Sequence, residues 1–496
     1  MPQGFSMTST SYNKVLSGQF PSEARQYTLE SSGKFSLTTY EAAMLLARSN
    51  QLWADQDGNG RIDLTYQFLT APNPAFVGMR LDGFSEFNAQ QKAQAKLAMQ
   101  TWADVTNVTF TEAQAGGEGQ MSFGNFSDGM HGATAFAFLP NSHPILDGQS
   151  WYRVPSDDTW SGWLRSRTSG DGPNQAPVMG SAGRFALVHE IGHTLGLDHP
   201  GDYNSREDTW LDWLWNRISG DDDYGLKADV VEDSVGYTLM SYWSETNTGQ
   251  DFAKDDAYVY PSAPQLHDIA AIQKLYGPNF STRAGDTTYG FNSNTDRDYL
   301  TATSSADKLV FSVWDGGGND TLDFSGFTQD QEINLNEGAF SDVGGLRGNV
   351  SIAHGVAIEN AMGGSGKDLL VGNELGNQLR GGAGDDVLKG GGGADELWGG
   401  AGKDSFMFSA VSDSTPQASD RIMDFTTGQD EISLAGMTRG SGLNFVSAFS
   451  GNAREAVLAY DESTHQGTLA IDFAGRGLAD FQIITVGRMA VTDIVA

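Results

Sequence analysis

A nine-residue repeat rich in glycine and aspartate runs without a break from residue 363 to residue 407. Its first copy reads Gly-Gly-Ser-Gly-Lys-Asp-Leu-Leu-Val, and further copies follow in register at residues 372–380, 381–389, 390–398 and 399–407. A fixed short period predicts a solenoid in which each repeat is one structural unit stacked on the next. The unbroken period argues against a flexible glycine-rich linker.

Two positions of the repeat carry its chemistry. The sixth holds Asp368, Asn377, Asp386, Asp395 and Asp404, and the eighth holds Leu370, Leu379, Leu388, Leu397 and Phe406. Glycines permit tight turns and expose carbonyl oxygens, the acidic side chains add carboxylates, and calcium takes about six to eight such oxygen ligands. The repeat therefore predicts an all-β parallel β-roll. Because its apolar ladder is thin, we expect the roll to fold only as it binds calcium.

The predicted calcium ligands of the repeats are Gly364, Gly366, Asp368, Gly381, Asp386, Gly390, Asp395, Gly399 and Asp404. Residues 372–380 have Leu375 and Asn377 in place of glycine and aspartate, so that turn should bind weakly. An earlier copy of the repeat lies at residues 315–323. The chain has 63 acidic against 30 basic side chains and a net charge of −33. About six calcium ions would add about +12 and relieve part of that repulsion.

A second motif, at residues 189–200, reads His-Glu-Ile-Gly-His-Thr-Leu-Gly-Leu-Asp-His-Pro. On a helix, His189 and His193 lie on one face, one turn apart. Gly196 can adopt the positive φ that ends a helix, which lets His199 return as a third ligand. Three imidazoles with an open fourth position are typical of a catalytic zinc, whereas a structural zinc is closed by four protein ligands.

The chemistry of such a site needs a base, and Glu190 stands next to the two helical histidines. Zinc lowers the pKa of its water to about 7, and a neighbouring carboxylate can take the water proton and pass it to the leaving amine. Histidines satisfied in an ordinary helix are the alternative, but the full pattern rarely arises by chance. The chain has no cysteine, which excludes thiolate metal sites and disulfides.

The segment before this motif alternates helical and strand patterns. We expect helices over residues 37–49 and 88–105 and strands over residues 62–69, 108–111 and 120–123. This order predicts an α/β catalytic half with a mixed sheet beside the zinc helix. A weaker calcium candidate, residues 55–63, follows the first half of an EF-hand loop but has Tyr66 where a bidentate glutamate is expected. A solvated acidic turn is the simpler interpretation.

Residues 133–140 are interpreted as a strand stopped by a proline. At a sheet edge beside the zinc, the backbone of such a strand can pair with an extended substrate peptide. The candidate pairing residues are Ala133, Ala135, Phe136 and Ala137. An internal strand is the alternative, and the sequence does not separate the two.

Composition limits the partners. The acid excess argues against nucleic acid and anionic membranes. No stretch approaches the ~20 apolar residues of a membrane span, so we expect no membrane insertion. The first eight residues, Met-Pro-Gln-Gly-Phe-Ser-Met-Thr, lack the basic start and apolar core of a signal peptide, so any export should use another signal.

Four segments carry a family resemblance: residues 189–204, residues 239–247 (Leu-Met-Ser-Tyr-Trp-Ser-Glu-Thr-Asn), residues 290–295 and residues 358–366. With the repeats that follow, the chain resembles the serralysins, metzincin metalloproteases with calcium-binding RTX repeats. The resemblance implies a secreted zinc endopeptidase with Glu190 as general base. It makes Met240 the turn beneath the metal and Tyr242 a movable zinc ligand that stabilises the oxyanion. Either residue alone would be interpreted as core.

The resemblance also implies further calcium ligands and an export route. The ligands are Arg283, Gly285 and Thr287 facing Asp315, Gly317 and Asp320, with Glu359 beside the roll. Export would use the type I secretion machinery, with a signal at the carboxyl end, where residues 491–496 read Val-Thr-Asp-Ile-Val-Ala. The resemblance makes residues 133–139 the substrate-pairing edge strand, and we expect a monomer acting on protein or peptide substrates.

We therefore expect a short propeptide at residues 1–10, a metalloprotease domain at residues 11–265 and a calcium-binding roll with the secretion signal at residues 266–496. Loops at residues 165–178 and 209–232, with Trp210, Trp213 and Trp215, look unlike the family and leave substrate preference open. Two alternatives remain. One is a calcium-dependent binding or adhesion protein with an inactive protease half, which the intact motif disfavours. The other is a processing enzyme or toxin of narrow specificity.

Overall fold

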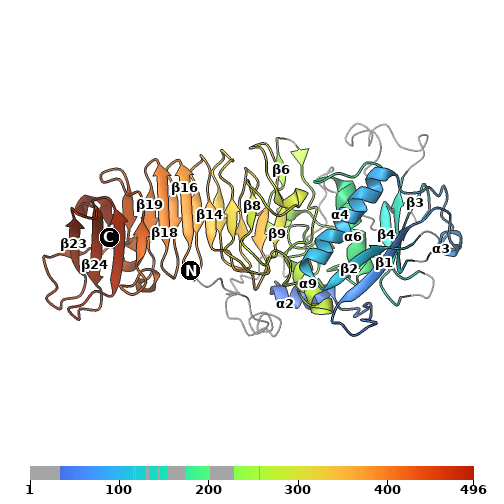
Figure 1. The fold of residues 1–496 in the computed structure, drawn as a ribbon, viewed down its shortest axis with the longest axis horizontal. Coiled ribbons are helices and arrows are strands. Elements are labelled where there is room, and N and C mark those ends of the chain that lie inside the picture. The colour runs from blue at the N-terminus through green and yellow to red at the C-terminus, as the bar shows by residue number, and fades with distance from the viewer. Residues whose placement is uncertain are drawn as a thin grey trace.

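The computed structural model describes residues 34–496 apart from 115–116, 118, 130–132, 143–145, 155–173, 202–227 and 256. The molecule is elongated, with helices and a sheet at one end and a stack of short strands leading to the other (Figure 1). The expected propeptide and the three loop tryptophans lie outside the described residues. Within the described part, no helix combines the length and apolarity needed to cross a bilayer.

One five-stranded sheet underlies the amino-terminal half. Its order is β2 (Val108–Glu112), β1 (Ile62–Phe68), β3 (Met121–Phe126), β5 (Gln149–Arg153) and β4 (Ala135–Ala137). The first four strands are parallel and β4 is antiparallel to β5, so the expected mixed sheet is confirmed. In β1, Ile62, Leu64 and Tyr66 point into the core while Asp63 is exposed, as its alternating sequence predicts.

Helices pack around this sheet. They are α2 (Thr39–Leu46), α3 (Pro74–Gly78), α4 (Ala89–Val105), α6 (Ala182–Thr194) and α9 (Leu266–Tyr276). Asn88 starts α4 with a reciprocal cap, because its side chain accepts from the Gln91 amide while the Gln91 side chain accepts from the Asn88 amide, both at 2.9 Å. The expected helix at 37–49 is shorter, because the Thr38 side chain caps it and the chain leaves the helix after Leu46.

The carboxyl-terminal half is built from two stacked sheets of short, mostly parallel strands. One sheet runs β22 (Asn444–Phe445), β23 (Glu455–Asp461), β24 (Gln466–Asp472), β25 (Phe481–Val486), β20 (Asp420–Ile422), β18 (Glu396–Ala401), β16 (Gln378–Ala383), β14 (Asn360–Met362), β10 (Thr321–Asp323) and β8 (Thr288–Gly290). The other runs β11 (Glu332–Asn334), β15 (Leu369–Val371), β17 (Val387–Lys389), β19 (Ser405–Met407), β21 (Glu431–Ser433) and β26 (Ile494–Val495). A small third sheet has the order β12 (Phe340–Ser341), β13 (Val350–Ile352) and β9 (Phe311–Val313). The remaining short elements are the paired strands β6 (Ala253–Lys254) and β7 (Ala257–Tyr258) and the helix α10 (Ala435–Thr438).

Successive repeats alternate between the two sheets, so each residue pairs with the one two repeats later, as Leu370 does with Leu388 and Leu379 with Leu397. All five residues of the eighth position are fully buried between the sheets. This arrangement is the predicted parallel roll. The antiparallel pairing of β23, β24 and β25 beyond it has no counterpart in the repeat and was not predicted.

Helix α9 lies at the junction and packs with the catalytic helices. The Tyr276 hydroxyl donates to the Leu195 carbonyl at 2.7 Å, and the Gln273 amide donates to the Val105 carbonyl at 2.8 Å. The hydrogen bonds of α9 thus reach the ends of both α6 and α4.

Candidate zinc site and calcium-binding turns

Three buried histidines meet at the end of α6. The Nε2 atom of His199 lies 3.0 Å from Nε2 of His193 and 3.3 Å from Nε2 of His189. Zinc–nitrogen bonds of about 2.0–2.1 Å in a tetrahedron separate neighbouring nitrogens by roughly 3.3 Å. Two of the three nitrogen pairs have this spacing, and all three ligand nitrogens lie within 4.8 Å of one another, so the residues fit one zinc ion.

The protonation of these rings suits a metal. Nδ1 of His189 lies 2.7 Å from the Leu239 carbonyl, and Nδ1 of His193 lies 2.7 Å from the Leu197 carbonyl. A carbonyl accepts only, so each Nδ1 donates and each Nε2 lone pair is left for an ion. Burial lowers the pKa of His189 to about 3, and it also lowers the pKa of His193 and His199. All three rings are therefore neutral at neutral pH, as zinc ligands must be.

The turn that returns His199 depends on Gly196. Its φ is +101°, and an added Cβ would come within 2.1 Å of the Gln51 carbonyl oxygen. The predicted positive φ is confirmed, and the close backbone explains why no side chain fits. The Asp198 amide donates to the Leu46 carbonyl at 2.7 Å, which fixes the loop against the end of α2.

Met240 lies against the last turn of the zinc helix. It is fully buried, and a Cβ on Gly192 would come within 2.9 Å of its sulfur and 3.0 Å of the Trp102 ring. The Trp102 indole also donates to the Val188 carbonyl at 3.0 Å, beside His189. Helix α6 is thus held between Trp102 and Met240.

Glu190 and Tyr242 lie beside the histidines. The Tyr242 ring centre is 4.6 Å from that of His199 and 6.0 Å from that of His189. Burial raises the pKa of the Tyr242 phenol, which keeps it protonated at neutral pH. Glu190 is buried, its Oε2 atom has no hydrogen-bond partner among the described residues, and burial raises its pKa to about 8. An unsatisfied buried carboxylate oxygen beside a metal site is suited to hold a proton.

The candidate substrate strand is at the sheet edge. β4 is the last strand in the order and pairs with β5, which favours the edge interpretation over an internal strand. Ala133 precedes the strand, which is shorter than the run from 133 to 140. The Thr134 carbonyl accepts from Arg153, and Phe138 pairs with Gln149 and Gly148. By alternation, Phe136 also faces β5, so Ala135 and Ala137 direct their backbone groups to the outer edge.

The repeat turns hold carboxylates in one geometry. From Asp386 on, one oxygen of each repeat aspartate accepts a backbone amide from the turn two repeats earlier, as Asp386 does from Asp368 at 2.8 Å and Asp404 from Asp386 at 3.0 Å. The other oxygen of Asp386, Asp395 and Asp404 is buried without a partner among the described residues. Burial raises the pKa of Asp386 and Asp395 to about 7. Buried, unpaired carboxylate oxygens fit calcium.

The glycines complete these turns. A Cβ on Gly381 would come within 2.4 Å of the free Asp386 oxygen and 2.7 Å of the Gly399 carbonyl, and one on Gly399 within 2.3 Å of the free Asp404 oxygen. The free Asp386 oxygen and the Gly399 carbonyl therefore both lie beside Gly381. In the degenerate repeat, the Asn377 amide instead donates to the Glu359 carbonyl at 3.0 Å. The side-chain amide that replaces the carboxylate is thus hydrogen-bonded to the protein itself.

The turn at residues 283–287 faces that at residues 315–320. The Thr287 amide donates to Asp320 Oδ1 at 2.8 Å, and a Cβ on Gly318 would lie 2.8 Å from both that oxygen and the Gly285 carbonyl. Glu359 joins them by accepting from the Asp320 amide at 2.8 Å. Burial and the neighbouring Asp315 raise the pKa of Asp320, whose other oxygen is buried without a partner in the described chain. These groups also fit calcium.

The acidic turn at residues 55–63 gives no such signal. The Asp55 carboxylate accepts from the Gly58 and Gly60 amides, each at 2.8 Å, and Ile62 begins a strand. The side chain is fully exposed and engaged within its own turn.

Comparison with known proteins matches both halves. The matrixin family model matches residues 79–226, and the model described as peptidase M10 serralysin C terminal matches residues 278–496. Metallopeptidase AprA of Pseudomonas marginalis is 58% identical over 466 residues, which cover 94% of this chain and 92% of that protein. Metalloprotease AprA of Pseudomonas entomophila (strain L48) is 55% identical over 94% of this chain and 91% of its own length. Serralysin A of Dickeya chrysanthemi is 46% identical over 93% and 90%. The chain belongs to the serralysin family. It is a zinc metalloendopeptidase, and its substrates are proteins.

Two supports of this serralysin site have no signature in the motifs. Asp268 of α9 accepts from the Leu239 amide at 2.7 Å and from the Gln265 amide at 2.9 Å, so it fixes the turn that carries Met240. Beyond the repeats, Asp420 accepts from the Asp395 amide and Asp430 from the Asp404 amide, at 3.0 and 3.2 Å. They continue the carboxylate series, but an insertion breaks the nine-residue period. An aspartate two residues before an apolar strand residue, as in Asp420 and Ile422, was the available signal.

Proposed function

We propose that this chain is a secreted endopeptidase that cleaves extended protein substrates with Glu190 as general base. The observation that carries the proposal is the unpaired buried oxygen of Glu190 beside three histidines whose ring nitrogens lie close enough to share one ion. Zinc, held by His189, His193 and His199, lowers the pKa of a water and polarises the scissile carbonyl when it is bound.

The side chains divide the proton transfers. Glu190 takes the proton of the attacking water and delivers it to the leaving amine. Burial raises the pKa of Glu190 toward ambient pH, which suits this exchange because a base of that kind both accepts and releases a proton readily. The protonated Tyr242 phenol donates to the oxyanion that forms on the substrate. Neutral imidazoles keep their lone pairs on the metal.

The substrate lies along β4 in this proposal. The backbone groups of Ala135 and Ala137 pair with an extended peptide, which becomes a further strand of the sheet. The ring centre of Phe136 lies 5.5 Å from that of Phe126, and this packing helps to hold the strand. Recognition through backbone groups gives broad specificity, because every peptide offers them.

We assign calcium to the roll and to the turn at residues 283–287, and we expect folding there to be coupled to binding. The stacked carboxylates support this, since without cations their charges repel. The resemblance supports a propeptide at residues 1–10, export through type I machinery with the signal near residue 496, and a monomer. The contacts of α9 favour ending the catalytic domain after that helix, at about residue 277, and beginning the roll domain there.

A Glu190→Gln variant tests the general base. We expect casein hydrolysis to fall by at least about 100-fold, with one zinc per chain retained, because glutamine keeps the shape and loses the proton acceptor. Glu112→Gln, at an exposed ion pair with Lys96, is the matched control and should behave like the wild type. Full hydrolysis by Glu190→Gln with zinc bound would refute the assigned base.

A further inference from the structure

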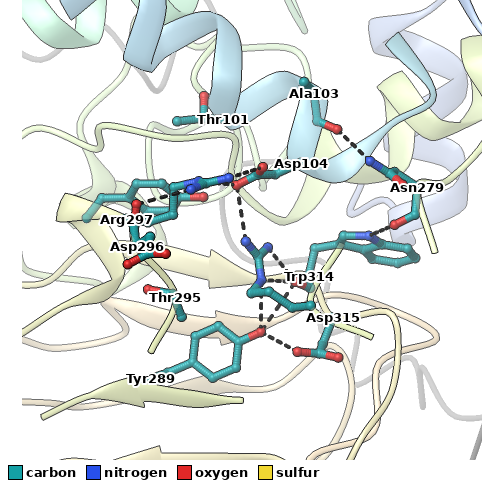
Figure 2. Close-up of polar contacts among 12 residues, drawn as sticks. Thr101, Ala103, Asp104, Asn279, Tyr289, Thr295, Asp296, Arg297, Trp314 and Asp315 are labelled. Carbon is teal, nitrogen blue, oxygen red and sulfur yellow. Dashed lines mark hydrogen bonds and ion pairs between the residues drawn. The ribbon is translucent and has the colours of Figure 1, made fainter. Parts of the chain in front are cut away.

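Two arginines from the carboxyl-terminal half form ion pairs with the last turn of α4 (Figure 2). Asp104 lies in this turn and is almost fully buried. Its carboxylate accepts from Nε and Nη2 of Arg297 at 2.7 and 2.8 Å and from Nη1 of Arg283 at 3.1 Å. A buried carboxylate held by two guanidinium groups has a defined position, because moving either side leaves a charge unpaired.

Arg283 also belongs to the candidate calcium turn. Its backbone is left-handed, with φ at 51°, and its guanidinium donates to the Trp314 carbonyl at 2.6 Å, one residue before Asp315. The Tyr289 hydroxyl lies 3.2 Å from Arg283 Nε and donates to Asp315 Oδ2 at 2.6 Å (Figure 2). The calcium turn and Asp104 are therefore joined through one side chain.

The same turn of α4 contacts the zinc helix. Trp102, two residues before Asp104, donates to the Val188 carbonyl at 3.0 Å and packs against Gly192, while both Trp102 and Val188 are fully buried. Asn279 adds a second tie by donating to the Ala103 carbonyl at 2.9 Å (Figure 2). One helical turn thus carries both the contact to the calcium turn and the contact to the zinc helix.

We propose that Asp104 is a positioning residue through which calcium at the 283–320 turns sets the alignment of the zinc helix. The proposal rests on the calcium site of the proposed function. Calcium gathers the carbonyls of residues 283–287 against Asp315 and Asp320, which fixes the backbone of Arg283. Arg283 then fixes Asp104, and the α4 turn presents Trp102 to Val188.

Other contacts between the two halves reach different elements. His354 lies 3.1 Å from the Thr39 hydroxyl at the start of α2, and Lys254 donates to the Gly344 carbonyl at 2.6 Å near β6. Neither involves α4. Beside the tie from Asn279 to Ala103, the route through Asp104 leads from the calcium turn to the helix holding Trp102. It predicts that the effects of changes at Asp104 and Asp320 do not add.

A double-mutant cycle on the full chain, in saturating calcium and zinc, tests this route. Asp320→Asn removes a calcium ligand, and the readouts are calcium bound per chain and hydrogen exchange of α6 amides (Ala182–Thr194). We expect Asp320→Asn to lose one calcium and to speed α6 exchange about tenfold, within the usual range of coupling between sites. In an Asp104→Asn background, adding Asp320→Asn should change α6 exchange less than about twofold, since the link is already cut.

Lys96→Met provides the matched control, because Lys96 is on the same helix in an ion pair with Glu112 that is about half exposed. In that background the full effect of Asp320→Asn should remain. A merely structural role for Asp104 would speed exchange in the single variant and leave the Asp320→Asn effect intact, which would overturn the proposal. If Asp104→Asn does not fold, Arg283→Lys replaces it, because lysine keeps the charge but cannot reach Asp104 and Trp314 together.

Calcium binding at this turn and its coupling to α6 are tested separately. Unchanged calcium content in Asp320→Asn means that the calcium assignment is wrong. One calcium lost with no change in α6 exchange means that calcium binds there and the coupling is absent.

Discussion

Met240 lies so close beneath Gly192 that a Cβ atom there would come within 2.9 Å of its sulfur. The contact packs Met240 against the helix that carries His189 and His193. It also explains the glycine in the last turn of α6, because alanine is favoured over glycine within helices by up to about 1 kcal/mol.

Gly192→Ala should therefore destabilise the catalytic half by about 1–3 kcal/mol, the usual cost of overpacking a core, and weaken zinc binding as α6 shifts. Thermal melting and zinc competition measure the two effects. Gly78→Ala is the control, because nothing lies within 4 Å of a Cβ there. Equal stability and zinc affinity of Gly192→Ala and the wild type would contradict this packing.

Asp268 should give the catalytic half a pH dependence. Burial raises its pKa from 3.8 to about 6 despite the hydrogen bonds it accepts. The unfolded chain releases this proton near pH 4 and the folded chain near pH 6, so ionisation favours unfolding across that window. The stability contributed falls as the pH rises from 4 to 6, by at most about 3 kcal/mol.

Asp268→Asn should melt below the wild type. Its amide oxygen can still accept from Leu239 and Gln265, but its NH2 group cannot accept from the Thr238 hydroxyl, which donates to Oδ1 at 2.5 Å. At fixed zinc and calcium, the gap should narrow as the pH rises from 4 to 7, since only the wild type bears the ionisation cost. A gap that stays constant or widens would count against the raised pKa.

The roll offers a matched pair of neighbouring aspartates. Asp386 is buried with one oxygen unpaired, whereas Asp385 is exposed and lies 2.6 Å from Lys367. Asp386→Asn should raise the calcium concentration needed to fold the roll by at least about tenfold, or ~1.4 kcal/mol for a lost ligand, and Asp385→Asn should not. Circular dichroism during calcium titration reports both. Indistinguishable titrations would exclude Asp386 as a ligand.

The substrate strand is tested with N-methylated peptides. Methylating the amides of alternate residues around the cleaved bond should lower kcat/KM about fivefold or more per lost hydrogen bond for one set, and the other set should be tolerated. This asymmetry follows because only Ala135 and Ala137 direct backbone groups outward. Equal effects of both sets would show that the substrate does not add to β4.

The sequence predicted what depends on local chemistry. The spacing of His189, His193 and Gly196 predicts a helix and its end, and the nine-residue period predicts the roll. Both patterns determine the backbone conformation of residues that are close in the sequence. The contacts of Asp268, Asp104 and Arg283 could not be predicted this way. Arg283 lies 179 residues from Asp104, and nothing in the local pattern of either residue indicates the other.

Element limits show the same division. The apolar stripe at residues 37–49 suggested a longer helix than α2, because periodicity does not register the cap at Thr38. Residues 133–140 likewise suggested a longer strand than β4. Its position at the edge depends on which strands pair, a property of the whole sheet rather than of the segment.

Zinc reconstitution shows whether hydrolysis depends on zinc held by the three histidines. The calcium-loaded protein, stripped of zinc by a selective chelator, should lose casein hydrolysis, and one equivalent of zinc per chain should restore it. His199→Ala should neither retain zinc nor recover, because its Nε2 completes the three-nitrogen site. Hydrolysis that persists in the zinc-free protein, or full recovery of His199→Ala, would contradict the account.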